Sequence, residues 1–436
     1  MTSAHILVLG AGPAGAAVAL GLNRLGYRVS VVSEWRRFEA VEGISQRVLD
    51  GLYHAGLRRA ADSAAAPSAR EVYWNGTRQT LNTEFLLDRR AFDHALRQDL
   101  QAAGIAVIEA KVRTLVSDTQ GHQVQLDGPD GTGMIAADFL VEARGRLAPL
   151  SGKGLRGPET LGLLNTWQGA PGPHGSAVES MEDGWVWMAR LADGRCYWQL
   201  TLDVASAELP GKDQLAGFCA TRRTSALVLD FFGAHAQQKA AVHARTSTAT
   251  LCLETSGGNW LRVGDAAMAV DPLSGNGIFQ SLSSALQAPA VIHTLLTRPD
   301  RVQLAQRFHQ RRIEHLFHRF ARIGRDFYAM EQRWAERPFW QARRTWPDQQ
   351  PIHVASGFEQ LRVEKAPVIN GDEIDEADVV VSPDQPLGIW HLQGVELAPI
   401  VQALQQGPGT DVLNTLAPEQ RHMLRGWLLA QGYRPA

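Results

Sequence analysis

The chain has 436 residues, of which 44% are apolar and 20% charged, a globular composition that excludes a disordered or collagen-like protein. At roughly 150 residues per domain, this length predicts two or three domains. Lysine and arginine number 43 against 45 aspartate and glutamate, so the net charge is -2. The chain therefore has no global basic field for nucleic acid or an anionic membrane, and we expect neither as a partner.

The cysteines and the first residues bear on location. Cys196, Cys219 and Cys252 lie far apart and form no CxxC pair, which argues against a metal site or a disulfide framework and favours a reducing compartment. Residues 1–5 carry no lysine or arginine, and Ile6–Leu9 is too short for the apolar part of a secretory leader. No stretch approaches the about 18 apolar residues of a membrane helix. We expect a cytoplasmic protein.

The N-terminal segment has the order strand, glycine-rich turn, helix, strand. The apolar run His5–Leu9 predicts a buried parallel strand, a helix follows until near Gly26, and residues 27–32 predict a second strand. This order predicts a dinucleotide-binding fold rather than a bare structural turn. We expect five residues of the turn to contact a cofactor, namely Gly10, Gly12, Pro13, Ala14 and Gly15.

Each glycine of this turn has its own physical reason. Gly10 permits the tight turn, Gly12 lets the backbone approach a pyrophosphate, and Gly15 lets helix and strand pack closely. The helix N-terminus supplies free N–H groups and the positive end of a dipole for the phosphates. Glu34, after the second strand, can accept hydrogen bonds from a ribose diol.

A second GxGxxG match, Gly152–Gly157, does not have this context. Residues 147–151 are a poor strand, and Pro158 directly after Gly157 is unsuited to the helix that should follow. We interpret it as a flexible basic loop, so the sequence predicts one dinucleotide fold.

A further motif follows the predicted strand at residues 260–263. Asp265, after the strand end, can bond a ribityl hydroxyl, while Gly275 and Gly277 let backbone amides approach a flat ring. The helix that begins near Ile278 places a dipole where an anionic reduced flavin needs one. The cofactor contacts expected here are Gly264, Asp265, Pro272, Gly275, Asn276 and Gly277.

These residues resemble the ribityl-binding region of FAD-dependent aromatic hydroxylases and their relatives, the flavin-dependent halogenases and geranylgeranyl reductases. Residues 89–93 resemble the family helix that bears an Arg and an Asp, which implies that Arg89, or its neighbour Arg90, approaches the FAD. Phe139–Arg146 resembles the strand and loop that end in Ala-x-Gly-Arg, although Arg144 stands where many members have Asp, Ser or Thr.

The resemblance implies an α/β chain with a Rossmann-like FAD-binding fold, interrupted by a mostly antiparallel substrate sheet and followed by a small C-terminal α+β module. Residues 185–189 and 196–202 fit strands of that sheet, with a hairpin turn at Asp193-Gly194. A helical region is predicted over residues 299–344. The expected domains are 1–160 with 256–345 for FAD, 161–255 for the substrate sheet, and 346–436 for the C-terminal module.

Halogenation is one alternative chemistry. Halogenases of this fold use a lysine upstream of the substrate sheet and a Trp-x-Trp-x-Ile-Pro segment. Here the first lysine is Lys111, and Trp185 and Trp187 are followed by Met188 and Ala189 instead of Ile-Pro. This inventory disfavours halogenation, and the two tryptophans on one strand face equally fit core packing.

The C-terminal module carries an acidic run that would repel phosphates and favours protein or peptide docking. A lid or a dimer element is the alternative. The run consists of Asp372, Glu373, Asp375, Glu376 and Asp378.

Among these relatives, the chain resembles flavoprotein monooxygenases that mature quinohemoprotein amine dehydrogenase. The resemblance implies hydroxylation of a tryptophan in a peptide or protein substrate, the small subunit of an amine dehydrogenase, during cysteine tryptophylquinone biogenesis. It implies FAD, dioxygen, a C4a-hydroperoxyflavin, and electrons from NADH, NADPH or reduced flavin. The alternatives are a hydroxylase of a small aromatic metabolite, a halogenase, and a non-catalytic flavoprotein. The sequence assigns no catalytic side chain; His54, His94 and His293 fit structural roles.

Overall fold

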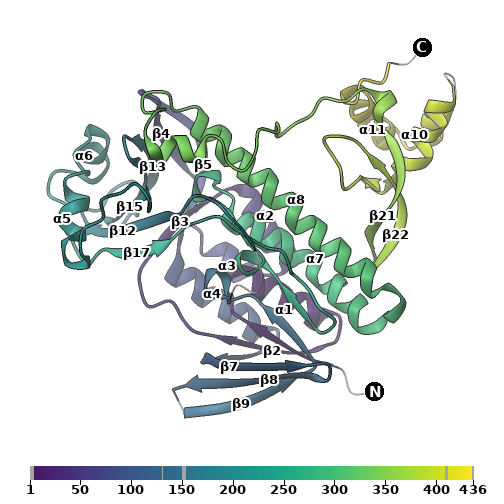
Figure 1. Cartoon of the computed structure of the whole chain (residues 1–436), viewed down its shortest axis with the longest axis horizontal. Helices are drawn as coiled ribbons and strands as arrows, with labels where there is room; N and C mark the ends of the chain where they lie inside the picture. The colour runs from purple at the N-terminus through teal and green to yellow at the C-terminus, as the bar shows by residue number, and fades with distance from the viewer. Residues whose placement is uncertain (1–3, 130, 150–153, 408–410, 435–436) are drawn as a thin grey trace. The chain divides into compact units, whose positions relative to one another are not determined.

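The computed structural model describes residues 4–129, 131–149, 154–407 and 411–434 (Figure 1). The chain divides into a first unit, residues 1–289 and 313–349, and a second unit, residues 290–312 and 350–436. The boundaries fall inside two long helices, α7 (Gly277–Thr297) and α8 (Val302–Ala329). Each unit has a hydrophobic core of its own.

A five-stranded parallel sheet forms the centre of the first unit. Its strands are short and almost entirely buried, as unbroken apolar runs predict. The strand predicted at His5–Leu9 is confirmed with the same bounds. Across the sheet the order is β19 (Trp260–Arg262), β10 (Phe139–Glu142), β1 (His5–Leu9), β2 (Arg28–Ser33) and β6 (Ala106–Glu109).

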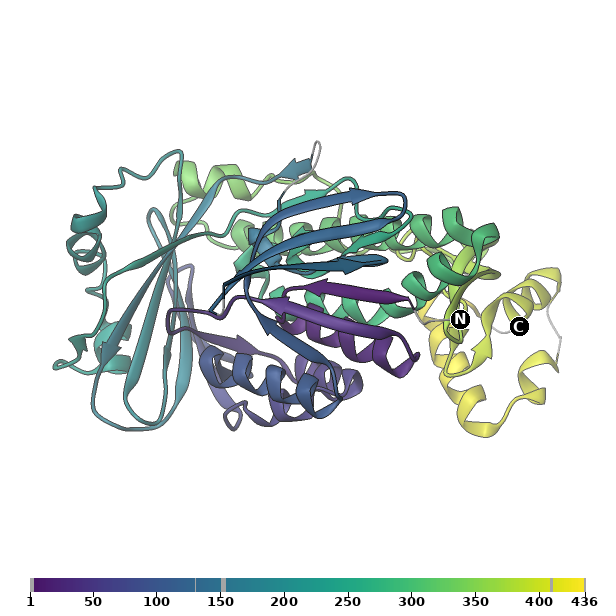
Figure 2. The ribbon, with the colours of Figure 1, turned by 90° about the horizontal axis from the view of Figure 1, so that it is seen from below.

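Helices cover one face of this sheet and a three-stranded antiparallel sheet covers the other (Figure 2). The strands on the second face pack Val124 and Leu126 against Leu7, Leu9 and Leu140 of the parallel sheet. The chain therefore has the layered α/β architecture expected from the sequence. The elements are α1 (Pro13–Arg24), α2 (Gln46–Ala55), α3 (Arg58–Asp62), α4 (Arg89–Ala102), β7 (Lys111–Asp118), β8 (Gly121–Gly128) and β9 (Gly131–Ala137).

A nine-stranded sheet interrupts the FAD-type fold, and only its β13–β4 pairing is parallel. Three of its strands come from residues 41–88, so the sheet is not confined to residues 161–255. Charged residues such as Arg70 and Glu71 hid this strand pattern in the sequence. The strands are β3 (Val41–Ile44), β4 (Ser68–Trp74), β5 (Thr77–Asp88), β12 (Thr160–Gln168), β13 (Gly175–Met181), β14 (Gly184–Arg190), β15 (Arg195–Asp203), β16 (Gln237–Gln238) and β17 (His243–Thr246), with helices α5 (Leu215–Ala220) and α6 (Ala226–Phe232) nearby in sequence.

Two sequence expectations need correction. The second glycine-rich match was expected to be a loop, but its residues Gly154–Arg156 form strand β11, while Gly152 and Lys153 lie outside the described residues. Strand β11 pairs with β18 (Thr250–Cys252), which in turn pairs with β20 (Met268–Ala269). The helical region predicted over residues 299–344 is interrupted between α8 and α9 (Pro338–Arg343). Proline favours the first turn of a helix and cannot continue one, so Pro338 begins α9.

The second unit is a small α+β module, as expected. A hairpin of β21 (Arg362–Asn370) and β22 (Glu373–Val381) turns through Gly371, whose φ is +61°. Its apolar face packs on two helices, with Val380, Leu397 and Leu424 in one core. The other elements are β23 (His391–Leu392), β24 (Val395–Glu396), α10 (Leu397–Gln406) and α11 (Pro418–Ala430). In the described part of the chain, no helix combines the length and the apolar character needed to cross a membrane.

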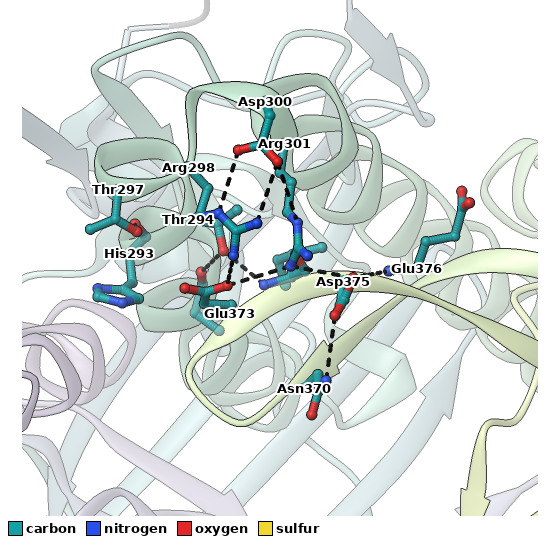
Figure 3. A network of polar contacts seen from close by, with 12 residues as sticks. His293, Thr294, Thr297, Arg298, Asp300, Arg301, Asn370, Glu373, Asp375 and Glu376 are labelled. Atoms are coloured by element: carbon teal, nitrogen blue, oxygen red, sulfur yellow. Dashed lines mark hydrogen bonds and ion pairs between the residues drawn. The ribbon is translucent and has the colours of Figure 1, made fainter.

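The acidic run of the hairpin is paired with cations of the same unit (Figure 3). The carboxylate of Glu373 lies 2.6 Å from Arg298 and 3.4 Å from Arg301, and Asp375 lies 3.3 Å from Arg301. Of the five acidic residues, Asp372 alone has no cationic partner among the described residues. The run is therefore not the free anionic surface that the sequence suggested. The remaining pairs are Glu376 with Arg307 and Asp378 with Lys365.

Candidate functional site

Four predicted motifs meet at one edge of the parallel sheet. Because β1, β2, β10 and β19 run in the same direction, their carboxyl ends lie together. Gly10, Glu34 and Ala143 directly follow three of these ends, and Gly264 comes two residues after the end of β19. Ligands of open α/β sheets bind at such an edge.

Gly10 and Gly15 pack the turn against the neighbouring strand. Gly10 has a φ of +109°, and a Cβ there would lie 2.4 Å from the carbonyl oxygen of Ala143. A Cβ at Gly15 would lie 1.9 Å from the carbonyl oxygen of Gly10. Neither position has room for a side chain, so both glycines shape the protein rather than the ligand space.

Gly12 differs, because the space beside it is open. A Cβ there would meet no described atom within 4 Å. Gly12 is the N-cap of α1, with Pro13 at the first helical position followed by Ala14. The cap has no side-chain hydrogen bond, and the first turn carries no acidic residue. The helix N-terminus is thus free to bind an anion, which fits the pyrophosphate of a dinucleotide.

Glu34 is exposed directly after β2, and the next residue, Trp35, lines an open pocket of about 660 Å³. Arg37 and Arg90 in the pocket wall are exposed and have no ion-pair partner among the described residues. The pocket combines aromatic and cationic side chains, which suits a phosphorylated or nucleotide ligand. Its lining is Trp35, Arg36, Arg37, Phe38, Glu39, Asp88, Arg90, Ala91, Asp93, His94 and Arg97.

Arg89 begins α4 and is buried. Its guanidinium lies 2.5 Å from Glu42 and 2.8 Å from Asp93, and its backbone N–H donates to the carbonyl oxygen of Ala40. Asp93 also pairs with Arg36 at 3.1 Å. These contacts fix Arg89 in place, while its predicted alternative Arg90 points to the solvent side of the helix.

Gly264 and Asp265 stand between β19 and α7. Gly264 has a φ of +59°, and a Cβ there would lie 2.8 Å from the Cβ of Ala14, so this turn packs directly on α1. Asp265 accepts hydrogen bonds from the amide of Gln280 at 2.7 Å and the hydroxyl of Ser281 at 3.2 Å. Burial raises the pKa of Asp265, an effect that the positive charge of Arg146 opposes.

Arg146 ends the predicted motif Phe139–Arg146, but its contacts in the site were not predicted. Its guanidinium lies 3.4 Å from the Asp265 carboxylate and donates to the carbonyl oxygens of Thr248 and Val270, the latter at 2.9 Å. It thereby joins the loop after β10 to the loop after β19. Arg144, at the unusual position of the same motif, pairs instead with Glu142 two residues earlier.

The loop expected to face the flavin ring is a short 3-10 turn, Pro272–Ser274, followed by Gly275 with a φ of +64°. The side chain of Asn276 donates to the carbonyl oxygen of Ser274. Gly277 begins α7, and a Cβ at Gly275 or Gly277 would meet no described atom within 4 Å. The side chain of Asn276 therefore closes the loop internally, while the space beside Gly275 and Gly277 stays open for a ligand.

The nine-stranded sheet presents β14 next to this loop. Trp185 is 3% exposed and packs in one cluster with Leu273 of the loop, as the core-packing interpretation predicted. Trp187 is only partly buried and contacts this cluster and the one around Tyr197. The alternate residues Val186 and Met188 pack on the opposite face. Trp187 therefore supplies an aromatic wall near the loop.

Comparison with known proteins identifies relatives of the chain. The model of the family described as FAD binding domain matches residues 3–315. A tryptophan 2-halogenase of Chondromyces crocatus is 24% identical over 406 residues, 87% of this chain and 74% of that protein.

Two solved structures are similar over nearly the whole chain. The peptidyl tryptophan dihydroxylase QhpG, essential for tryptophylquinone cofactor biogenesis, is 61% identical with a TM-score of 0.87, covering 99% of this chain and 100% of that chain. The flavin-dependent halogenase CmlS has a TM-score of 0.78 at 18% identity, covering 98% of this chain and 94% of that chain. At this identity the similarity concerns the fold only.

Proposed function

The chain belongs to the FAD-binding-domain family of flavoproteins, and from this premise we propose that it is an FAD-dependent monooxygenase that hydroxylates a tryptophan side chain of a peptide or protein substrate twice, during tryptophylquinone cofactor biogenesis. The single observation that carries the proposal is the 61% identity to a peptidyl tryptophan dihydroxylase over the full length of both chains.

The residues of the sheet edge fit FAD. The open N-terminus of α1 at Gly12 would hold the pyrophosphate, Glu34 the adenosine ribose and Asp265 the ribityl chain. The loop Pro272–Gly277 would carry the ring system, and Arg89, held in place by Glu42 and Asp93, would lie beside the cofactor. Reduced FAD, when bound, supplies the chemistry that activates dioxygen and transfers an oxygen atom to the electron-rich indole.

The protein's own residues orient the groups that would bind the cofactor and exclude water from the site. Gln280, Ser281 and Arg146 fix the orientation of the Asp265 carboxylate. The aromatic cluster beside the loop excludes water from one side of the ring site, which limits the loss of activated oxygen as hydrogen peroxide. The partly buried Trp187 offers a flat surface against which a substrate indole can stack.

Electrons would come from NADH, NADPH or separately reduced flavin. The described residues contain one dinucleotide fold, so a nicotinamide donor would bind only transiently. The unpaired guanidiniums of Arg37 and Arg90 in the pocket near Glu34 support phosphate docking there. Three free cysteines, all buried, support a reducing compartment such as the cytoplasm.

Intact-mass analysis tests the substrate. The crosslinked small subunit of an amine dehydrogenase is incubated with the protein, FAD, a reductant and dioxygen. We expect the subunit to gain the mass of two oxygen atoms. If the subunit is unchanged while a free aromatic compound is hydroxylated, the small-metabolite alternative is correct. A chlorine adduct in the presence of chloride would instead support the halogenase alternative.

Gly12→Val tests the cofactor site. A valine side chain would fill the space where the pyrophosphate approaches, so we expect a colourless protein whose affinity for FAD has fallen at least about a hundredfold. The fold should persist, because the protein leaves this space free. Gly211→Val is the matched control, since Gly211 is also a helix N-cap with open space around it. FAD retention by Gly12→Val would refute the assignment.

A further inference from the structure

A chain of two hydrogen bonds joins the nine-stranded sheet to the loop expected to face the flavin. The indole N–H of Trp185 on β14 donates to the hydroxyl of Tyr328 at 3.1 Å. That hydroxyl donates to Oδ1 of Asp271 at 3.0 Å. The same oxygen accepts from the backbone N–H of Leu273 at 2.9 Å, inside the loop. Tyr328 on α8 thus stands between two elements that are distant in sequence.

The direction of these bonds is fixed by chemistry. An indole N–H can only donate, so the Tyr328 oxygen accepts there, and its own proton is left for Asp271. Burial raises the pKa of Tyr328 well above its usual value, and the negative charge of Asp271 adds to this effect. The hydroxyl therefore keeps its proton throughout the neutral range and remains a donor to Asp271.

All three side chains are buried: Trp185 is 3% exposed, Tyr328 2% and Asp271 8%. The rings of Phe339 and Trp340 enclose Tyr328, with centroids at 5.7 and 5.9 Å. The charges that act on the chain of bonds are those of Arg343, which is itself paired with Asp203, and of Arg146. Water has no ready access to replace a lost partner here, so removal of the hydroxyl leaves both an indole N–H and a carboxylate oxygen with one bond fewer.

We propose that Tyr328 is a positioning residue, which holds the loop Pro272–Gly277 at a fixed place against β14. The inference rests on the proposed function, in which the loop carries the flavin and the sheet carries the substrate. With the hydroxyl in place, flavin and substrate keep the separation that oxygen transfer requires. Without it, the loop moves, water enters, and reduced flavin yields hydrogen peroxide instead of product.

The test compares Tyr328→Phe with Tyr197→Phe in the FAD-loaded protein. Tyr197 is a matched control, because it is a buried tyrosine of the same sheet whose hydroxyl contacts Arg195 rather than the loop. We expect Tyr328→Phe to bind FAD normally but to speed amide hydrogen exchange at residues 272–277 by at least about fivefold. Product formed per reduced flavin should fall by a similar factor, with hydrogen peroxide making up the difference. Tyr197→Phe should change neither quantity.

Two outcomes separate this inference from the proposed function. If the wild-type protein hydroxylates no peptide but Tyr328→Phe still speeds exchange in the loop, the substrate assignment fails and the positioning role stands. If exchange and product yield both stay at wild-type values in Tyr328→Phe, the positioning role is refuted.

A second variant separates the two bonds of the chain. Trp185→Phe breaks the bond to β14 but leaves the bond between Tyr328 and Asp271, so exchange in the loop should speed up by less than in Tyr328→Phe. Equal loosening by Trp185→Phe and Tyr328→Phe would mean that the aromatic packing positions the loop, and would overturn the inference. If Tyr328→Phe does not fold, Asp271→Asn replaces it, because the amide keeps an acceptor oxygen while both bonds to it lose their charge and should weaken.

Discussion

The glycine-rich turn at residues 10–15 and the turn at Gly264, together called the cofactor cradle, are held in place by a different kind of contact from the C-terminal hairpin. In the cradle, backbone atoms meet through glycines: Gly10 lies against the backbone of Ala143, and Gly15 lies against the backbone of Gly10. In the hairpin, side-chain charges meet: Arg298 and Arg301, in the turn between α7 and α8, pair with Glu373 on β22. The first kind of contact is encoded by residues that can only be glycine. The second is encoded by charges whose partners the sequence does not identify. Close backbone packing should therefore tolerate substitution far less than an exposed ion-pair network.

Gly15→Ala should have the largest effect. The added methyl would lie 1.9 Å from the carbonyl oxygen of Gly10, and neither backbone segment can move without opening the parallel sheet. We expect a loss of at least about 3 kcal/mol in the free energy of unfolding of the FAD-free protein. Urea unfolding measures it.

Gly12→Ala is the matched control for Gly15→Ala, since the same methyl group in the same turn meets no described atom. It should change the free energy of unfolding by less than about 1 kcal/mol. Similar losses in the two variants would contradict the view that only one of these glycines shapes the protein.

This contrast also explains what could be predicted from the sequence. The strand His5–Leu9 and the turn after it were readable because each residue type has a local reason: apolar side chains for burial, glycines for close approach. The strands predicted at residues 185–189 and 196–202 were readable from their apolar and aromatic residues, and they lie within β14 and β15. The acidic run at residues 372–378 was misinterpreted, because its charge is visible in the sequence but the arginines that pair with Glu373 and Asp375 lie far earlier in the chain. These arginines stand in the turn between α7 and α8, where no local pattern indicates the pairing.

The site residues that were not predicted share one property: each contacts a residue that is distant from it in the sequence. Arg146 is an expected motif residue, but its bond to the carbonyl oxygen of Val270 has no local signature. Tyr328 lies on a helix that reads as amphipathic, and nothing in its surroundings indicates Asp271 as its partner. Such contacts depend on how the helix packs on the sheet, which a single sequence does not specify.

Thr294→Val should have an intermediate effect, in the second unit. The buried hydroxyl of Thr294 accepts from the backbone N–H of Ile374 at 2.7 Å and donates to the carbonyl oxygen of Ala290 at 2.8 Å. Valine keeps the shape but leaves the Ile374 N–H buried without an acceptor, which costs about 1–3 kcal/mol of unfolding free energy. Urea unfolding and the exchange rate of the Ile374 amide measure the loss. Thr297→Val is the control, because its exposed hydroxyl bonds only within the helix, and a loss as large as that of Thr294→Val would contradict the argument.

Glu373→Gln should have the smallest effect, although Glu373 makes the most ion pairs of the acidic run. Its side chain is 31% exposed, Arg298 keeps Asp300 as a partner, and Arg301 keeps Asp375. Exposed pairs gain little beyond the cost of holding long side chains still, so amide exchange along the hairpin should speed up by no more than about threefold, and the difference should vanish in high salt. Glu376→Gln, whose partner Arg307 lies 4.0 Å away, should leave exchange unchanged and serves as the control. If Glu373→Gln instead loosened the hairpin more than Thr294→Val, the ion pairs and not the buried hydrogen bond would hold β22 to the helices, and the ranking of backbone contacts above surface charge in this chain would be wrong.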